Sequence, residues 1–476
     1  MLQPTIGLTY QDVLLVPKRS PLSSRSEADV VSLFTKHITL NIPLVSANMA
    51  TVTEHKMAIA MAREGGLGVI HQFGTIEEQV DEVRRVKRST SYIIDSPISV
   101  PVSTNIGEAT EVMRNTGVTS LLVEHHGELV GIFTKRDYLF ETDLQKSITE
   151  VMTPKNRMIT APYGIALAEA KKILHSYRIE KLPLLGEDGR LQGLITTQDI
   201  VKLESWPLAS RDQKGRLRVG AAVGVKHTIP RVEALVAAGA DVIILDIAHA
   251  HADVVIDRLK EIKSLFHVDV MVGNIATAEA AKDLIEAGAD GLKVGIGPSP
   301  VCTTRIIAGA GVPQLTAVMN VAHVAKQYGI PVTADGGMKY PGDVTKAIAA
   351  GANTIFSGSF FAGTDESPGM IIKKDGKRYK KYIGSASYES GHIRKEKETN
   401  AHFKKRLDMF VEGVSALVDY KGPVSDVIGG LVKGLQSGIS YCGAHTIEEM
   451  QANAEFIQIT SSGWTESGSR GMKTAE

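Results

Sequence analysis

The sequence predicts an α/β protein in which eight parallel strands close into a (β/α)₈ TIM barrel. Eight short apolar runs recur along the chain, and from the third onward most of them alternate with helical stretches. Strands that are apolar along nearly their whole length are typical of a parallel sheet with helices on both faces. In addition, the tripeptides at 239–241, 288–290 and 351–353, Gly-Ala-Asp or Gly-Ala-Asn, each close a helix and open a strand. At 476 residues, the chain is also long enough for two domains.

The expected strands end in small or polar residues that lead into loops. In chain order they are Ile42–Ala47, Leu67–His71, Leu217–Val223, Asp241–Asp246, Val268–Gly273, Gly291–Gly295, Ile330–Ala334 and Asn353–Ser357. Glycine just past a helix end adopts the left-handed conformation at no steric cost, which explains the repeated tripeptide. An open doubly wound sheet is the structural alternative, but no G-x-G-x-x-G follows an early strand.

A second pattern interrupts the barrel between the second and third strands. The block GIFTKRD at 131–137 matches GLITTQD at 193–199, and each block follows a helix and then a strand. A repeat of this size indicates a duplicated supersecondary unit. The expected organisation is a first barrel part at 1–92, an insert at 93–205 with halves at about 93–148 and 149–205, and a second barrel part at 206–476.

The two halves of the insert resemble a tandem pair of CBS modules. Thr134, Asp137, Thr196 and Asp199 occupy positions that contact a nucleotide ribose in many such pairs. A second interpretation is that each Thr and Asp caps the helix that follows it. The sequence leaves both interpretations open.

Composition excludes several classes of protein. Lys plus Arg and Asp plus Glu number 53 each, so the formal net charge is zero, whereas a general nucleic-acid binder usually has a basic excess. Two cysteines rule out a disulfide scaffold and indicate a reducing compartment. No signal peptide is visible and no apolar run approaches 18 residues. We therefore expect a cytoplasmic protein with no membrane and no nucleic-acid partner.

The sharpest local signal is the loop GIGPSPVCTTR at 295–305, which directly follows the sixth expected strand. Active sites of barrels lie at the carboxyl ends of the strands, and this loop presents Cys302 there. A thiolate adds to electrophilic carbon, and the hydroxyls of Thr303 and Thr304 are placed to relay protons. Cys442, in contrast, lies in SYCGA and is interpreted as structural packing.

Two further loops predict an anion site. Asp335-Gly336-Gly337 follows the seventh strand, and Gly358-Ser359 follows the eighth. The loops after strands seven and eight of such barrels often bind phosphate through backbone N–H groups. Ionised Asp335 only accepts hydrogen bonds, so it suits a ribose diol. Taken singly, each loop is ordinary turn chemistry, but together they favour a nucleoside monophosphate.

The chain resembles the IMP dehydrogenase/GMP reductase family over essentially its whole length. The matching stretches are GLTYQDVLLVP at 7–17, SANM at 46–49, VCTTR at 301–305, GVPQ at 311–314, ADGG at 334–337 and AGTDESPG at 362–369, together with the insert in the second βα connection.

The resemblance implies a role for each matching residue. Cys302 would attack C2 of the purine ring and form a covalent thioimidate, with Thr304 and Glu366 as the proton-transfer pair. The other substrate contacts would be Met49 on the base, Asp335 on the ribose, Gly337, Gly358 and Ser359 on the phosphate, Tyr382 in the base pocket and Glu412 at the purine N1 edge. Asp246, Asn274 and Gly295 would line the pocket of a nicotinamide cofactor.

The resemblance also carries expectations about ions, effectors and assembly. In many relatives the loop before the cysteine binds a monovalent cation, for which Gly297, Ser299 and Cys302 could offer carbonyls to potassium. Regulatory purine nucleotides would bind the insert, and the subunits would form a homotetramer that can pair into an octamer. In this chain, Ser299-Pro300 replaces the Gly-Ser usual before the cysteine, and Ser385-Ala386 replaces Met-Gly after Tyr382.

Two reactions fit the family, and the expected flap at about 384–412 favours one of them. IMP dehydrogenase oxidises IMP with NAD and hydrolyses the thioimidate, usually with an Arg-Tyr pair in the flap that activates water. This flap has no Arg-Tyr dipeptide, because Arg394 precedes Lys395 and Arg406 precedes Leu407. Asn48 and the segment 403–415 also resemble GMP reductases that carry CBS modules.

The sequence therefore favours GMP reductase, which reduces GMP to IMP and ammonia with NADPH. IMP dehydrogenase, which makes XMP from IMP with NAD, remains the alternative, since the overall architecture suits it equally. An alternative from another class is a catalytically silent nucleotide sensor. The intact Cys302, Thr304 and Glu366 argue against a silent sensor.

Overall fold

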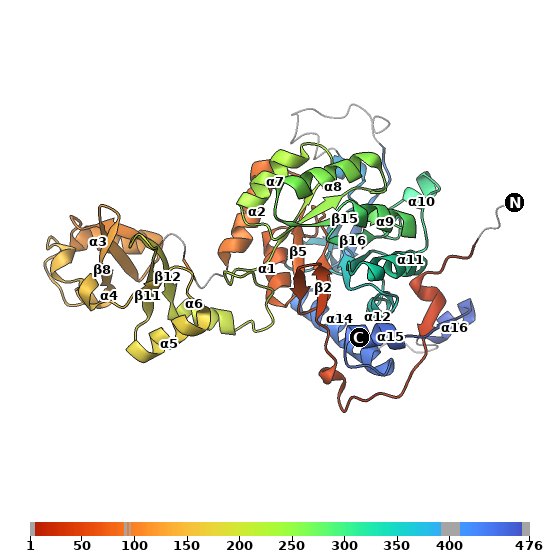
Figure 1. Ribbon diagram of the computed structural model, residues 1–476, viewed down its shortest axis with the longest axis horizontal. Coiled ribbons are helices and arrows are strands. Elements are labelled where there is room, and N and C mark those ends of the chain that lie inside the picture. Colours follow the sequence, from red (N-terminus) through yellow and green to blue (C-terminus); the bar gives the residue numbers. More distant parts are fainter. Residues whose placement is uncertain (1–4, 90–92, 95–96, 392–409, 469–476) are drawn as a thin grey trace. The chain divides into compact units, whose positions relative to one another are not determined.

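The computed structural model contains two compact units (Figure 1). The residues it describes are 5–89, 93–94, 97–391 and 410–468. The larger unit consists of Met1–Ser89, Leu208–Asp212 and Leu217–Glu476, and the smaller one of Thr90–Pro207 and Gln213–Arg216.

Eight parallel strands of the larger unit close into a barrel, which confirms the predicted α/β barrel and excludes an open doubly wound sheet. Around the barrel they are β4 (Leu44–Ser46), β5 (Leu67–Ile70), β13 (Gly220–Val223), β14 (Val242–Asp246), β15 (Asp269–Ile275), β16 (Gly291–Val294), β17 (Val332–Asp335) and β18 (Thr354–Ser357). The ring is closed by β18, which pairs with β4. Each strand overlaps one of the eight apolar runs in the sequence.

The barrel strands are buried on both faces. Every residue of β4, β5, β13, β16 and β18 is buried. Small and apolar side chains are what such positions require, since helices cover the outside and side chains fill the inside. Lys293 in β16 departs from this pattern, because its charged side chain is only 2% exposed.

Helices follow the strands around the barrel. They are α1 (His55–Arg63), α2 (Ile76–Ser89), α7 (Thr228–Ala237), α8 (Asp253–Leu265), α9 (Ala278–Glu286), α10 (Thr304–Ile307), α11 (Gln314–Gln327) and α12 (Pro341–Ala349). After β18 come α14 (Val424–Tyr441), α15 (Ile447–Asn453) and α16 (Ser461–Glu466). Where α7, α9 and α12 end, Gly239, Gly288 and Gly351 have φ values of 97°, 101° and 109°. The repeated tripeptide thus marks left-handed helix ends, as expected.

In the described part of the larger unit, three small antiparallel sheets lie outside the barrel. They are β1 (Val13–Leu15) with β22 (Phe456–Gln458), β2 (Ser32–Thr35) with β3 (Ile38–Leu40), and β19 (Ile372–Lys374), β20 (Lys377–Ile383) and β21 (Ser415–Asp419) in that order. The third sheet brackets the expected flap, because β20 ends just before it and β21 begins just after it. Of the flap itself, 392–409, including Arg394 and Arg406, lies outside the described residues.

The smaller unit repeats one order of elements. The first half contains β6 (Ser99–Pro101), α3 (Ile106–Thr116), β7 (Ser120–His125), β8 (Glu128–Thr134), α4 (Lys135–Tyr138) and β9 (Thr153–Pro154). The second contains β10 (Ala161–Pro162), α5 (Leu167–Tyr177), β11 (Lys181–Leu185), β12 (Leu191–Thr196) and α6 (Thr197–Glu204). This repetition is what the two matching sequence blocks predict, while the CBS assignment stays a prediction.

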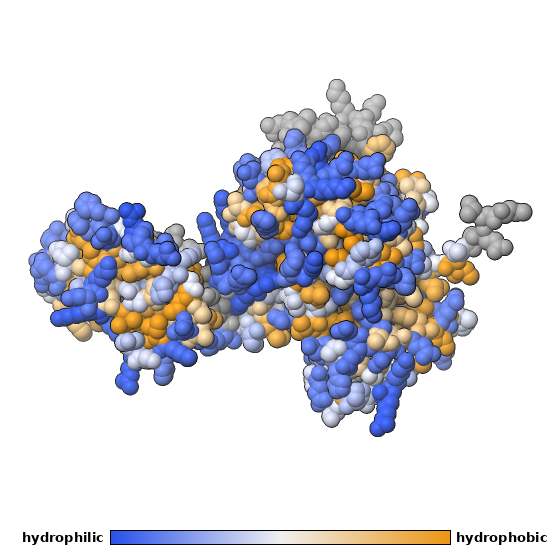
Figure 2. Space-filling view, in the orientation of Figure 1, coloured by the Kyte–Doolittle hydropathy of each residue, from blue (hydrophilic) through white to orange (hydrophobic). Residues whose placement is uncertain are grey.

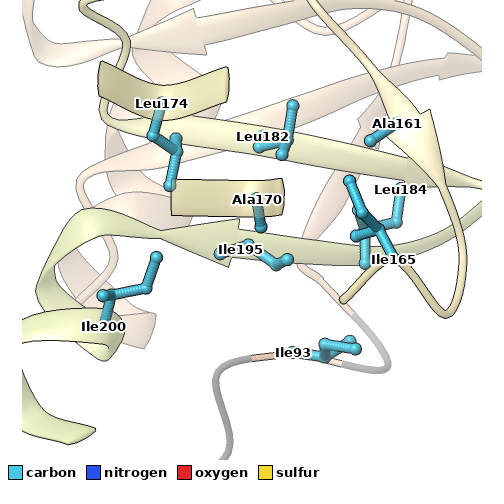
Figure 3. Close-up of a cluster of buried hydrophobic side chains, with 9 residues drawn as sticks. All are labelled: Ile93, Ala161, Ile165, Ala170, Leu174, Leu182, Leu184, Ile195 and Ile200. Atoms are coloured by element: carbon cyan, nitrogen blue, oxygen red, sulfur yellow. The ribbon is translucent and has the colours of Figure 1, made fainter. Parts of the chain in front are cut away.

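Each half of the smaller unit has its own apolar core. In the second half, Leu182, Leu184 and Ile195 of the sheet face Ala170 and Leu174 of α5 (Figure 3). The first half buries a cluster that includes Leu121, Val123 and Phe133. A third cluster joins the halves, because Leu122, Leu129 and Ile132 pack with Leu185 and Leu191.

The face of the protein in Figure 2 is mainly hydrophilic, with apolar residues scattered among the polar ones. Such scattering is ordinary for a folded protein. Among the residues that the structure describes, no helix combines the length and the apolar character needed to cross a membrane.

Candidate functional site

A cavity of about 760 Å³ opens where the barrel strands end. Residues at the end of each of the eight strands, or just after it, line the cavity, from Ala47 after β4 to Ser359 after β18. Its remaining wall comes from residues near the two ends of the flap, including Tyr382 and Glu412. This is the position that enzyme sites take in (β/α)₈ barrels.

The loop after β16 is folded by its own hydrogen bonds. The Cys302 amide donates to the Ser299 carbonyl at 3.0 Å. The Arg305 guanidinium donates to the carbonyls of Ile296 at 3.1 Å and Val312 at 2.6 Å. These contacts hold the loop at the cavity, where the half-buried thiol of Cys302 forms part of the lining.

A relay of side chains leads away from this thiol. Cys302 Sγ lies 3.2 Å from Thr304 Oγ1, and the Thr304 hydroxyl donates to Glu412 Oε2 at 2.7 Å. All three residues line the cavity. A proton can therefore pass between Glu412 and a group bound beside the thiol through a single hydroxyl.

Backbone pairing explains why Glu412 lies so close to a residue far away in the chain. The Thr303 amide donates to the Glu412 carbonyl at 2.7 Å, and the Val414 amide donates to the Val301 carbonyl at 3.0 Å. On its other side, the Glu412 amide donates to the Ala386 carbonyl at 3.0 Å. The end of the flap thus runs alongside the cysteine loop.

Glu366, which the sequence pairs with Thr304, lies elsewhere. Its carboxylate accepts a hydrogen bond from the Val424 amide at 2.9 Å, at the beginning of α14. It is not among the described residues that line the cavity. In this structure Thr304 pairs with Glu412 instead, the residue that the resemblance had assigned to the purine N1 edge.

Two residues expected at the substrate, Met49 and Tyr382, come together around Gly358. A Cβ atom at this position would lie 2.5 Å from Tyr382 Oη and 2.7 Å from Met49 Sδ, so only glycine fits between them. Burial raises the pKa of Tyr382, so its phenol is neutral and can donate. Ser359 also lines the cavity, whereas in the loop after β17 it is Gly336 rather than Gly337 that does so.

The residues expected at the ribose and the cofactor form one polar network. Asn274 Nδ2 donates to Asp335 Oδ2 at 2.8 Å and to the Gly295 carbonyl at 2.6 Å. Asn48 Nδ2 donates to Asp246 Oδ2 at 2.8 Å. These five residues all line the cavity.

The cavity continues past this network toward the loops after β5 and β13. Gln72, Phe73, Gly224, Val225 and Arg231 line that part. Phe73 and Arg231 are both largely buried, and the Arg231 guanidinium donates to Gln79 Oε1 at 2.8 Å and to the Gly74 carbonyl at 3.1 Å. The residues expected at the cofactor line the same cavity as those expected at the nucleotide, which fits a dinucleotide cofactor beside a nucleotide.

Sequence reasoning missed Lys293, whose Nζ lies among Asp246, Asn274 and Asp335. The available signal was a lysine inside an otherwise apolar strand, GLKV. The Thr304–Glu412 pair had no comparable signal, because 108 positions separate the two residues.

In the insert, Asp137 acts as a helix cap. Its carboxylate accepts from the Thr134 amide at 2.6 Å and from the Thr134 hydroxyl at 2.9 Å. Thr196 ends β12 in the equivalent place, and the side chain of Asp199 lies outside the described residues. Nucleotide binding by these four residues stays a prediction.

The expected cation site also stays a prediction. The Ser299 carbonyl accepts a hydrogen bond from the Cys302 amide. Gly297, Ser299 and Cys302 all line the cavity. The network of hydrogen bonds in the loop is compatible with an ion but does not require one.

The chain is similar to known proteins over nearly its whole length. The model of the IMP dehydrogenase / GMP reductase domain matches residues 7–470. The inosine-5'-monophosphate dehydrogenase of Nitrosopumilus maritimus (strain SCM1) is 50% identical over 466 residues, which cover 97% of each chain. The GMP reductase of Leishmania donovani is 46% identical over 480 residues, 98% of this chain and 97% of that one.

Solved structures of GMP reductase are also similar to this chain. A variant of GMP reductase from Trypanosoma brucei in complex with guanosine 5'-monophosphate matches with a TM-score of 0.87 at 43% identity, over 99% of both chains. The same enzyme in complex with guanosine 5'-triphosphate matches with a TM-score of 0.76 at 40% identity, over 96% of this chain and 99% of the other. On the domain match and these relatives, the chain belongs to the IMP dehydrogenase/GMP reductase family of oxidoreductases.

Proposed function

We propose that the protein is a GMP reductase that converts GMP to IMP and ammonia with NADPH. The observation that carries this proposal is the relay from Cys302 through Thr304 to Glu412, combined with the absence of an Arg-Tyr pair from the flap. The relay can protonate a departing amine. Without the pair, the flap lacks the water-activating group that the dehydrogenase reaction usually employs.

In the first half of the reaction, the Cys302 thiolate forms a bond to C2 of the guanine ring. The exocyclic amine must then leave, and expelling an amine requires that it be protonated. Thr304 passes a proton from Glu412 to this nitrogen, ammonia departs, and the ring remains bound to sulfur as a thioimidate. Asp335 holds the ribose, and Met49 and Tyr382 hold the base.

A bound nicotinamide cofactor supplies the hydride. Hydride at C2 allows the C–S bond to break, which releases IMP and returns Cys302 as a thiolate. Asp246 and Asn274, which line the cavity, would hold the nicotinamide side of the cofactor. In sum, GMP, NADPH and two protons become IMP, NADP⁺ and ammonium.

The decisive experiment incubates the purified protein with GMP plus NADPH and, separately, with IMP plus NAD. We expect steady oxidation of NADPH with GMP, and IMP as the product. With IMP and NAD we expect at most slow conversion, limited by hydrolysis of the covalent adduct. XMP formation well above the rate of GMP reduction would overturn the proposal.

IMP dehydrogenase is the second candidate, because a relative with that name is 50% identical over nearly the whole chain. In that case Arg394 or Arg406 of the flap would activate water in place of the missing Arg-Tyr pair. A silent sensor is the remaining alternative, and any turnover of either substrate pair excludes it.

Further parts of the proposal concern the insert, the ion and the assembly. We infer that purine nucleotides regulate the enzyme through the insert, that the active form is a homotetramer able to pair into an octamer, and that potassium would bind at the cysteine loop. Titration of activity with purine nucleotides and with potassium, and light scattering of the purified protein, test these three statements.

A further inference from the structure

Lys293 is a charged residue at the centre of the catalytic end of the barrel. From β16 its Nζ lies 2.7 Å from Asp246 Oδ1 on β14 and 2.9 Å from Asp335 Oδ2 on β17. It also donates to Asn274 Oδ1 on β15, and the ring centroid of Phe356 on β18 lies 5.1 Å away. One ammonium group thus contacts four other strands.

The environment keeps this lysine charged. Burial by itself lowers the pKa of Lys293, but Asp246 and Asp335 outweigh burial and raise the pKa above its ordinary value. A buried ammonium is costly unless it is paired, and an apolar side chain would fill this strand position without that cost. The lysine is therefore poorly explained by packing alone.

Its two acidic partners belong to different parts of the cavity. Asp335 follows the strand whose loop faces the nucleotide, while Asp246 is assigned to the cofactor side. Each carboxylate also accepts a hydrogen bond from a side-chain amide. Asn274 donates to Asp335 and Asn48 donates to Asp246, both at 2.8 Å. Lys293 is the group that contacts both carboxylates at once.

We propose that Lys293 is a positioning residue that couples the nucleotide pocket to the cofactor pocket, because its ammonium holds Asp335 and Asp246 in a common arrangement. This inference rests on the proposed binding of a purine nucleotide and a nicotinamide cofactor, but not on which of the two family reactions takes place. In that arrangement both carboxylates can accept hydrogen bonds from hydroxyl donors of the ligands.

Loss of the lysine charge should alter both pockets together. Two carboxylates without a cation between them cannot both remain ionised cheaply, so the pair takes up a proton at higher pH. The other groups that face the pair do not replace the charge. Asn48 and Asn274 are neutral, and the buried phenols of Tyr10 and Tyr382, which face Asp335, have pKa values raised by burial.

The test is Lys293→Met, which keeps the length of the side chain and removes its charge. We expect GMP binding, measured by calorimetry, to weaken about tenfold or more, as for the loss of a charge-assisted contact. The KM of the dinucleotide should rise as well. The acid limb of kcat/KM should move upward by about one pH unit.

Lys263→Met is the matched control. Lys263 pairs with Asp290 at 2.7 Å, next to the amino end of β16 and away from the cavity. This variant also breaks an ion pair of the barrel, but affinity and pH profile should stay as in the wild type. Equal losses in the two lysine variants would mean that Lys293 serves stability only, and would overturn the inference.

Asp246→Asn provides a second test that does not depend on the folding of the methionine variant. With one carboxylate charge gone, Lys293 pairs more strongly with Asp335 and competes with the ribose, so GMP should bind about threefold more weakly or worse. In Lys293→Met/Asp246→Asn, the shifted acid limb should return toward the wild-type position. An unchanged GMP affinity in Asp246→Asn, or in Lys293→Met, would contradict the coupling.

Calorimetry with GMP and with IMP needs no turnover, and the kinetic arms are run with GMP plus NADPH and with IMP plus NAD. A protein that proves to be a dehydrogenase therefore leaves the comparison of variants intact. Failure of the coupling shows instead as normal turnover with unchanged affinities in both Lys293→Met and Asp246→Asn.

Discussion

At Cys302 one thiol contacts a hydroxyl and, through it, a carboxylate. The distances of 3.2 Å and 2.7 Å make a short chain from Sγ to Glu412, without any histidine or lysine in it. In the proposed reaction, the nucleophile and the proton relay are thus separate functions, carried by neighbouring side chains of two loops. Substitutions can therefore remove one function and leave the other.

Replacing Cys302 with Ser should abolish turnover while GMP still binds. Phosphate and ribose contacts lie on other loops, and a neutral hydroxyl is a far poorer nucleophile than a thiolate. We expect the rate to fall on the order of 10³-fold or more. Calorimetry measures the GMP affinity and the cofactor's absorbance measures the rate. Turnover near the wild-type rate would eliminate the covalent mechanism.

Glu412→Gln should slow deamination by about 10²–10⁴-fold, the usual contribution of a positioned acid or base. Glutamine keeps the length of the side chain and its hydrogen bond to Thr304 but cannot supply a proton. The readout is ammonia release from GMP, compared with the hydride-transfer step alone, starting from IMP and the oxidised cofactor. Hydride transfer should be affected less.

Glu366→Gln is the matched control for that variant. Its carboxylate holds the Val424 amide at the beginning of α14, where glutamine can still accept. Activity should change far less than in Glu412→Gln. If Glu366→Gln proves the more damaging of the two, the relay read from the geometry is incorrect and the assignment made from the sequence returns.

Residues that line the cavity could be predicted where they lie at the end of an apolar strand or in the loop after it. Cys302 and Gly358 lie in loops after apolar strands, Asp335 ends one, and all three line the cavity. The contact between Glu412 and Thr304 could not be predicted from the sequence, because it arises from backbone pairing between the end of the flap and Thr303. The contacts of Lys293 were not predicted, because its strand was interpreted as uniformly apolar.

At the scale of elements, the barrel strands were predictable and their ends were not. A parallel strand buried on both faces is apolar almost throughout, so its existence is visible in the sequence. Its end depends on pairing with a neighbour. For example, the sequence ends the seventh strand at Ala334, but β17 includes Asp335 because that residue pairs with Phe356 of β18.

This one-residue extension matters for the site. Because Asp335 is the last residue of a strand rather than the first of a loop, pairing with Phe356 of β18 holds its backbone. The Gln314 side chain adds a further hydrogen bond to the Asp335 carbonyl, at 3.1 Å. The carboxylate expected at the ribose is therefore built on a rigid element, as precise positioning requires.

At the scale of the whole molecule, the larger unit holds the two chain segments that lead to the insert close together. Lys87, near the end of α2, pairs with Asp212 at 3.0 Å and with Asp241 at 2.7 Å. On the returning segment, the Ser210 amide donates to the Ala62 carbonyl at 2.7 Å. The barrel therefore has its own contacts at the point where the insert leaves and returns.

Deleting residues 90–207 and joining Ser89 to Leu208 with a short glycine-serine linker should leave a folded barrel. Insertions in loops are well tolerated, and so is their removal where the flanking segments are tied together. Basal turnover should survive, and any response to purine nucleotides should disappear. Circular dichroism tests whether the barrel is folded, and the cofactor assay measures turnover and its response to purine nucleotides.

The Lys87→Met variant of the deleted protein serves as its control. Breaking a buried pair by removing one partner costs about 3–5 kcal/mol, so this variant should melt well below the parent. A deletion protein that is unfolded, or folded but inactive, would mean that the insert belongs to the catalytic core.

The circular order of the strands also determines when the barrel can form as the chain is synthesised. β4 pairs with β18, the last barrel strand to be made, and β5 pairs with β13, which follows the insert. A ribosome therefore completes the whole smaller unit while the first two barrel strands still lack a partner on one side. Since domains generally fold as units and N-terminal parts first, we expect the insert to be the first folded body of the nascent chain. Until Ser357 has emerged, the open edge of β4 is exposed to wrong pairing, which is the stage at which this protein is most prone to aggregate.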